Sequence, residues 1–471
     1  MNQPRNPLAP RGSLKRRLLS GGAWTLGNRL LVTLTQLAAL ALLARLLAPA
    51  DMGVYFLIAN LVSVLTVISQ LGLTQSVVRL VADALARNLP GRARTAILNV
   101  LILGALSATV TGTLLQFGFG QWLAHTVFHS DLMAAMTLWT SLWVLLQTLQ
   151  RFLDEMFRGL HDLRLAAIFG GIVTGVLTVS FYAVLYWARG EADLRNVLML
   201  NVVAFGVSVV MAGAVLMRKI RPLRGEGALA VREIMAISWP LFLASITNII
   251  LLRADLWILG MYASEQEVAV YGAAARIITV VTIPLTMASA ILAPMIAELH
   301  AQGQKDRLEK VLRVVATLGG LPAVAVIVLF VFAGQPGLEL LYGDALYREG
   351  WPVLVLLGLG QLVNVWSGVC VQLLMMTGHQ RAVMVITLAS SALAILGALL
   401  AVRPFGMYGV ACAFAAGVAL QNIIMVIHSY RMLGVRSYML INPMTLRGLM
   451  VDLKETMRQR RQSRLQSRRG D

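Results

Sequence analysis

Two long apolar runs near the start of the chain, residues 22–47 and 53–81, are separated by the short polar link Ala48-Pro49-Ala50-Asp51-Met52. Each run exceeds the ~20 residues that a helix needs to cross about 30 Å of hydrocarbon. Pro49 favours the end of a helix at the link, because it lacks a backbone N–H and its φ is fixed. The pattern therefore predicts an antiparallel transmembrane hairpin.

The same layout returns in the second half of the chain. An apolar run begins at Pro240, the polar segment 262–267 predicts a turn, and the next run opens at Tyr271. Trp24 and Tyr55 are 31 positions apart, and Trp239 and Tyr271 are 32 apart. This spacing indicates an internal repeat that begins with the hairpin.

The length criterion predicts twelve membrane spans. Because backbone polar groups must be satisfied inside lipid and the runs do not alternate, the spans are expected to be helices, which makes an all-α integral membrane protein. The twelve expected spans cover residues 22–47, 53–81, 96–119, 132–153, 165–187, 194–217, 234–262, 268–299, 314–332, 351–376, 382–402 and 407–433.

Composition and charge support membrane insertion rather than nucleic-acid binding. Hydrophobic residues make up 58% of the 471 residues and charged residues 13%, against about 25% charged in soluble proteins. Thirty-one of the 40 Lys and Arg lie on the membrane side of the N-terminus and only four on the opposite side. By the positive-inside rule both termini of this multi-pass membrane protein are expected in the cytoplasm.

The basic segment 218–233 divides two halves of six spans each. An even number of spans gives both halves the same orientation, so the repeat is a parallel one, as found in transporters that work by alternating access. The expected organisation is a basic N-terminus, an N-terminal six-helix lobe, a linker, a C-terminal six-helix lobe and a basic tail, at residues 1–21, 22–217, 218–233, 234–433 and 434–471.

Several segments resemble the bacterial polysaccharide flippases, the Wzx-like members of the multidrug/oligosaccharidyl-lipid/polysaccharide exporter superfamily. The segments are residues 45–55 (RLLAPADMGVY), 253–260 (RADLWILG) and 270–276 (VYGAAAR), together with the Gly-His segments after the fourth and tenth spans. The resemblance runs from about residue 20 to residue 433. It implies a V-shaped transporter with two lobes and a central cavity. Such a protein moves a polyprenyl-diphosphate-linked oligosaccharide to the outer leaflet for O-antigen, capsule or exopolysaccharide biosynthesis.

Three alternatives stay open: a cation-coupled multidrug exporter, a lipid II flippase and a membrane-embedded glycan polymerase or ligase. Lipid II flippases typically have fourteen spans, two more than expected here. A polymerase or ligase would be expected to carry a substantial outer loop, yet the longest one, residues 334–350, has 17 residues. No phosphate-binding loop or H-E-x-x-H zinc motif occurs in the sequence, so no enzymatic activity, cofactor or metal is expected.

Charged residues at membrane depth are the candidate substrate-binding residues, because burying each costs at least ~2.5–3.5 kcal/mol at a helix centre. Arg253, Asp255 and Arg276 lie seven or more positions inside their expected spans, and Arg29 lies a third of the way into the first. Arg29 either lines a cavity or extends back to the surface. Asp255 and Arg276 are each about ten positions from the same turn, so they are expected to pair. Arg253 is then expected to face the anionic diphosphate headgroup.

The sequence also indicates hinges and further partners. Gly72 lies in the middle of the second expected span, and Pro284 and Pro294 lie in the eighth, where each either permits bending or makes a static kink. The basic termini are expected to contact anionic membrane lipids, and other polysaccharide-assembly proteins are possible partners. Two cysteines in apolar runs, Cys370 and Cys412, are interpreted as small core residues.

Overall fold

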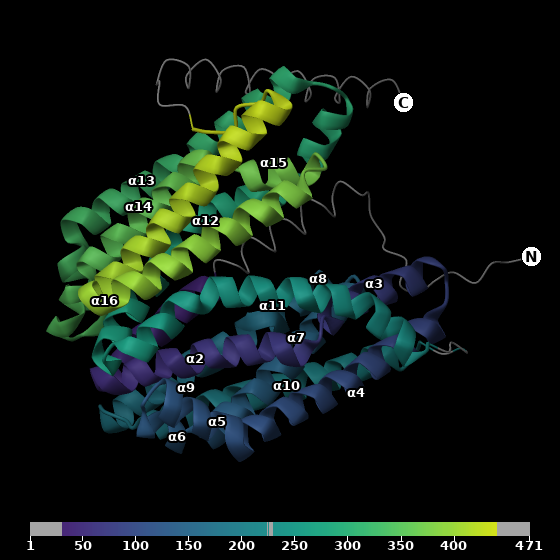
Figure 1. Cartoon of the computed structure of the whole chain (residues 1–471). Coiled ribbons are helices and arrows are strands. Elements are labelled where there is room, and N and C mark those ends of the chain that lie inside the picture. Colours follow the sequence, from purple (N-terminus) through teal and green to yellow (C-terminus); the bar gives the residue numbers. More distant parts are fainter. Residues whose placement is uncertain (1–30, 224, 226–228, 440–471) are drawn as a thin grey trace, which may run out of the picture. The chain divides into compact units, whose positions relative to one another are not determined.

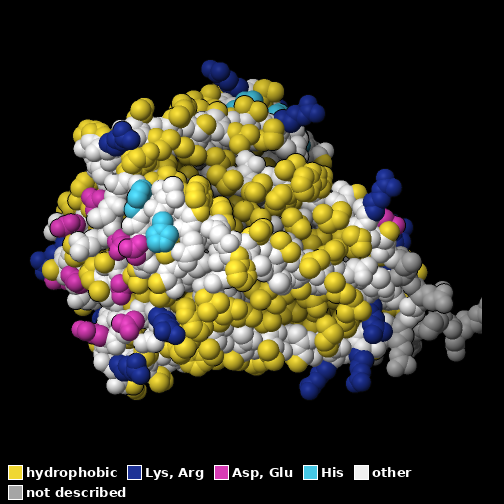
Figure 2. Space-filling view, turned by 60° about the horizontal axis from the view of Figure 1, so that its bottom comes forward, with side chains coloured by type: hydrophobic (Ala, Val, Ile, Leu, Met, Phe, Trp, Pro, Cys, Tyr) yellow, Lys and Arg dark blue, Asp and Glu magenta, His cyan; other side chains and the backbone are white. Residues whose placement is uncertain are grey.

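The computed structural model describes residues 31–223, 225 and 229–439, and these are helical, with turns and bends but no strand. The all-α prediction is therefore confirmed for this part of the chain. Among the described residues, nine helices are long and apolar enough to cross a membrane, as in a multi-pass membrane protein. Figure 2 shows hydrophobic side chains over most of one face, with charged side chains gathered towards its margins.

Each of the twelve expected spans is helical where the structure describes it, apart from residue 47 and short breaks at residues 71–72, 136 and 368–369. The first is the helix Leu31–Leu46. The others correspond to α2 (Pro49–Gln70) with α3 (Leu73–Ala86); α4 (Pro90–Leu114) with η1 (Leu115–Phe119); α7 (Thr137–Gly159); α8 (Leu163–Ala167), η3 (Ile168–Ile172) and α9 (Val173–Arg189); α10 (Leu194–Ile220); α11 (Val231–Tyr262); α12 (Glu265–Ala301); α13 (Lys305–Tyr342); α14 (Trp351–Ser367) with α15 (Cys370–Met376); and α16 (Gln380–Leu433) for the last two. The short helices α5 (Gly120–Trp122), η2 (Leu123–Val127), α6 (Asp131–Ala135) and η4 (Ala345–Gly350) lie in the connections.

Two compact units divide the chain. The first comprises residues 1–272 and 339–347, and the second residues 273–338 and 348–471. These units differ from the lobes expected from the repeat, because α11 packs against α2 and α3 and so joins the first unit. The lobes are defined by the repeat rather than by packing, and their boundaries stay a prediction.

The first unit is organised around α7, which packs against α2, α3, α4 and α10 (Figure 1). Its core includes the fully buried side chains of Val77, Val81, Ile97, Phe152 and Met156. Gly104 of α4 lies against the ring of Phe152, where a side chain would meet the ring at 2.2 Å. Small residues at such positions bring helix backbones close together, which supplies packing that lipid alone cannot.

The second expected span is interrupted at Leu71 and Gly72, which lie in the left-handed region with φ of 49° and 73°. This break separates α2 from α3. Ser76 of α3 and Ser238 of α11 are both buried, and their hydroxyl oxygens lie 2.7 Å apart beside the break.

In the second unit, α14 and α16 run side by side (Figure 1). Gly360 of α14 lies against the backbone of Ala415. Gly406, with φ of 54° and ψ of −137°, interrupts α16 at the boundary expected between the eleventh and twelfth spans. After α16, residues 434–439 form a segment without regular secondary structure that we call the strap. It lies against the Ser367 end of α14.

Candidate functional site

The candidate site lies in the first unit, where the end of α11 and the start of α12 pack on α2. The contact is closest at the turn ends of the two predicted hairpins. A Cβ atom built on Gly53 would lie 1.8 Å from the backbone oxygen of Glu265. The Ser130 hydroxyl donates a hydrogen bond of 2.6 Å to the Glu265 carboxylate. The turns of the two predicted hairpins, with which the two halves of the internal repeat begin, are therefore in direct contact.

Arg253 lies on α11 opposite a buried polar residue of α2. Its side chain is half-buried, and its backbone oxygen accepts a hydrogen bond of 3.1 Å from the side-chain amide of Asn60. Asn60 is fully buried. Because a side-chain amide satisfied by a backbone carbonyl links the two helices, Asn60 fixes the part of α11 from which the Arg253 guanidinium projects.

Asp255 is half-buried and has a hydrogen-bond partner that the sequence did not indicate. The hydroxyl of Tyr271 donates to its carboxylate over 3.2 Å, and Tyr271 is fully buried on α12. This bond joins α11 to α12 across the hairpin turn. Arg276 is half-buried and belongs to the second unit, so its expected ion pair with Asp255 stays a prediction.

Aromatic and aliphatic side chains close the apolar surroundings of the site. Gly260 lies against Leu57 and Phe128, and Phe128 meets Trp257 edge-to-face at 6.4 Å between ring centroids. Gly272 lies against the ring of Phe56. Because these neighbours are apolar and both Arg253 and Asp255 are half-buried, an electrostatic interaction made by either charge is stronger here than in bulk solvent.

The remaining predicted residues are placed as follows. Arg29 lies outside the described residues. Pro284 and Pro294 lie within the bounds of α12, but the structure does not describe their side chains. Gly72 forms the break between α2 and α3, and its role as a hinge stays a prediction.

Sequence reasoning missed a buried carboxylate on α7. The Asp154 side chain is 2% exposed, and the half-exposed Arg158 donates to one of its oxygens over 3.2 Å. Gln150, one turn earlier, donates to the Phe169 oxygen and the Thr174 hydroxyl. The fourth expected span ended at residue 153, one position too early to include this carboxylate. The signal available in the sequence was the i, i+4 spacing of Asp154 and Arg158, which places the two side chains next to each other on a helix.

The described residues include no group of three or more His, Cys, Asp or Glu that could hold a metal ion. The site is instead an apolar environment with the Arg253 cation, the hydrogen-bonded carboxylates of Asp255 and Glu265 and the Asn60 amide. Such an arrangement can bind and orient an anionic or polyhydroxylated group.

Two family models match the chain. The one described as polysaccharide biosynthesis protein matches residues 18–300, and the one described as MatE matches residues 240–400. A search of curated proteins gives no match.

The chain is also similar to solved transporter structures. An inward-facing multidrug-resistance MATE family transporter of the MOP superfamily, 13% identical, gives a TM-score of 0.69 over 85% of this chain and 94% of that one. The MATE multidrug transporter DinF-BH, 15% identical, gives 0.63 over 92% and 98%. A MOP superfamily transporter from Pyrococcus furiosus, 13% identical, gives 0.58 over 89% and 96%. At these identities the likeness shows the fold, which is that of MOP-superfamily transporters.

Proposed function

Because this chain belongs to the polysaccharide biosynthesis protein family, we propose that it moves a polyprenyl-diphosphate-linked oligosaccharide across the bacterial cytoplasmic membrane. The movement is from the inner to the outer leaflet, by alternating access, and it supplies surface polysaccharide such as O-antigen, capsule or exopolysaccharide. The family match over residues 18–300 is the observation that carries this proposal.

The role proposed for Arg253 is to bind the diphosphate headgroup. A guanidinium presents several N–H donors in a planar fork that fits phosphate oxygens, and its charge persists at any physiological pH. Its half-buried position and the Asn60 bond to its backbone support this role. Asp255 is proposed to be mainly structural, since Tyr271 already donates to its carboxylate.

A second candidate function is multidrug export. Two observations favour it: the MatE match over residues 240–400 and the fold shared with MATE transporters. The two functions differ in the ligand, because a drug exporter binds amphipathic and often cationic compounds. A fixed arginine at the site disfavours a cationic ligand through like-charge repulsion.

Reconstitution into vesicles separates the two functions. The purified chain is expected to expose a labelled polyprenyl-diphosphate oligosaccharide on the opposite leaflet, as scored by an impermeant lectin or glycosidase. Arg253→Ala is expected to lower the initial rate at least tenfold, because a lost charge-assisted hydrogen bond is worth about 1.5–3 kcal/mol. Arg253→Lys keeps the charge but lacks the planar fork of donors, so its initial rate should lie between those of the unmodified chain and Arg253→Ala. Vesicles that export a cationic dye but leave the glycan lipid in place would refute the proposal.

A further inference from the structure

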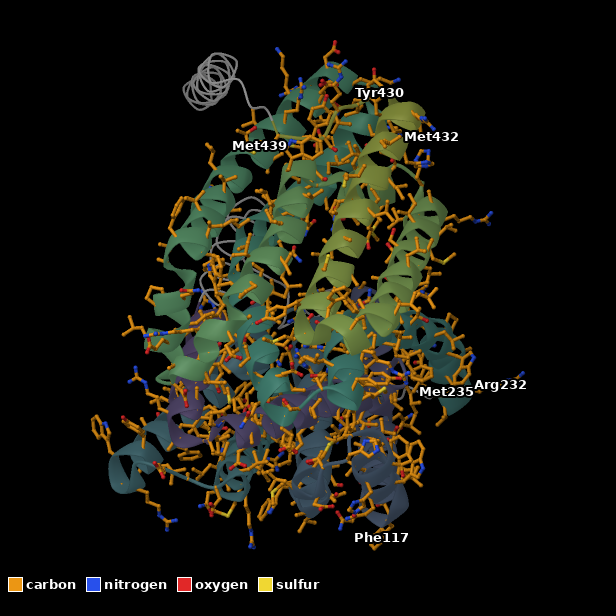
Figure 3. All side chains as sticks on the ribbon, turned by 60° about the vertical axis from the view of Figure 1, so that its left-hand side comes forward. Phe117, Arg232, Met235, Tyr430, Met432 and Met439 are labelled. Atoms are coloured by element: carbon orange, nitrogen blue, oxygen red, sulfur yellow. The ribbon has the colours of Figure 1, made fainter. Side chains whose placement is uncertain are left out.

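One end of the second unit holds a pocket that lies apart from the candidate site. The last turn of α12, the first turn of α13 and the end of α16 surround it, and its volume is about 170 Å³. Apolar side chains form most of its lining, and two basic side chains complete it: Leu299, Leu308, Met432, Leu433 and Val435, with His300 and Lys305. Figure 3 shows Met432 at the same end of α16 as Tyr430.

The strap fixes one wall of this pocket. Val435 and Ser437 of the strap are almost fully buried. The Ser437 hydroxyl donates to the Ser367 oxygen over 3.2 Å, and the Met439 N–H donates to the Trp366 oxygen over 2.8 Å. These bonds hold the C-terminal end of the strap, and the Gly434 N–H donates to the Tyr430 oxygen at its start, so the Val435 side of the pocket is a built surface.

The basic side chains at the pocket are available to an anion. His300, Lys305 and Arg436 are exposed, and Lys305 makes no ion pair in the part of the chain that the structure describes. The Arg436 guanidinium lies over the ring of Tyr430, 5.5 Å from its centroid. The neighbouring Glu309 carboxylate is already engaged, since it accepts from Arg313 and from the backbone N–H of Arg436.

The position of the pocket defines the kind of ligand. It lies where three apolar helices end and basic residues begin, which is the level of the lipid headgroups for a membrane-spanning bundle. Its volume is below the roughly 300–1,000 Å³ of sites that enclose a whole small molecule. It therefore fits part of an amphiphile, with an apolar chain inside and an anionic group at the rim.

We propose that this pocket binds an acidic phospholipid, with the phosphate on His300 and Lys305 and the first carbons of one acyl chain against Leu308, Met432 and Val435. The inference does not depend on which substrate the protein carries. Bound in this way, the lipid joins the ends of α12, α13 and α16 at the membrane surface.

Native mass spectrometry of the purified full chain, titrated with phosphatidylglycerol, measures this binding directly. Lys305→Glu is expected to weaken binding about tenfold or more, because a hydrogen bond to a charged group is worth about 1.5–3 kcal/mol. Arg307→Glu is the matched control. It makes the same charge change two residues further along α13, and the two positions are ~200° apart around the helix. His300→Gln tests the second basic side chain of the lining.

Two further measurements test the apolar half of the site. Met432 is 58% exposed at the mouth of the pocket, so Met432→Glu is expected to weaken lipid binding without unfolding the protein. Phosphatidylcholine should bind more weakly than phosphatidylglycerol, and soluble glycerol phosphate should not displace the lipid. Equal losses for Lys305→Glu and Arg307→Glu, equal binding of the two lipids, or displacement by glycerol phosphate would each overturn the proposal.

Discussion

Gly72 offers a quantitative test of how the first unit is packed. It lies in the left-handed region at φ of 73°, at the break between α2 and α3. A Cβ atom at this position would lie 2.2 Å from the backbone oxygen of Ser238 and 2.7 Å from the backbone nitrogen of Phe242. Both atoms belong to the backbone of α11, so neither can rotate away as a side chain would.

Gly72→Ala is therefore expected to destabilise the fold through two separable effects. A left-handed backbone conformation costs an alanine about 1–2 kcal/mol relative to glycine. Forcing α11 away from the break adds an overpacking penalty of about 1–3 kcal/mol. Together the two effects predict a loss of about 2–5 kcal/mol in the free energy of unfolding.

Two other glycines serve as matched controls. Gly434 is in the same left-handed region, with φ of 64° and ψ of 22°, but has no heavy atom within 4 Å of a Cβ position, so Gly434→Ala should show only the backbone effect. Gly213 is within helix α10 and is equally open, so Gly213→Ala should stabilise the protein by up to about 1 kcal/mol through helix propensity.

The measurement is reversible unfolding in mixed micelles, followed by far-ultraviolet circular dichroism. The expected order of stability, from highest to lowest, is Gly213→Ala, the unmodified chain, Gly434→Ala and Gly72→Ala. A Gly72→Ala protein no less stable than Gly434→Ala would refute the close approach of α11 to the break. A loss of transport without any loss of stability would instead favour a hinge at Gly72.

Three further predictions concern the expected Asp255–Arg276 pair, the Asp162–Lys219 interaction and the topology of the termini. Reversing the expected pair, Asp255→Arg with Arg276→Asp, should recover part of the folded protein that either single change loses, and no recovery would disprove the pair. Although burial raises the pKa of Asp162, hydrogen bonds from Lys219 and Leu165 outweigh it and hold that pKa below its usual 3.8. The stability that this interaction contributes is present above pH 4 and is lost as the pH falls through the folded-state pKa. Lys219→Met should therefore lower the unfolding midpoint at pH 7, and a difference that persists undiminished near pH 2 would contradict this. Tags at both termini should be cytoplasmic by protease accessibility, and external cleavage of either would reverse the expected topology.

The positions of the helices were predictable from the sequence, because the length of an apolar run and the polar residues at its ends act locally. Gly406 interrupts α16 where two spans were expected to meet, whereas α2 begins at Pro49, inside the link predicted at residues 48–52 and four residues before the expected span. The interruption of the second span at Gly72 was indicated only by the glycine itself. The close approach of α11, which leaves no room for a side chain at this position, appears only in the structure.

The partners of the charged residues could not be predicted. Arg253 and Asp255 were identified because burying a charge at membrane depth is costly, so such a residue usually has a function or a partner. Their contacts with Asn60 and Tyr271 appeared only in the structure. Asp154 was missed because the expected span ended one residue before it.

These contacts could not be predicted because the helices are surrounded by lipid. In a soluble protein the polar face of a helix points to water, so the apolar face is known to be buried. In lipid both faces are apolar, and the sequence no longer distinguishes the buried face. The sequence alone therefore determined where the chain crosses the membrane and which side is basic. Only the tertiary structure decided which helices pack together. It alone shows that the turns of the two predicted hairpins meet at Gly53 and Glu265.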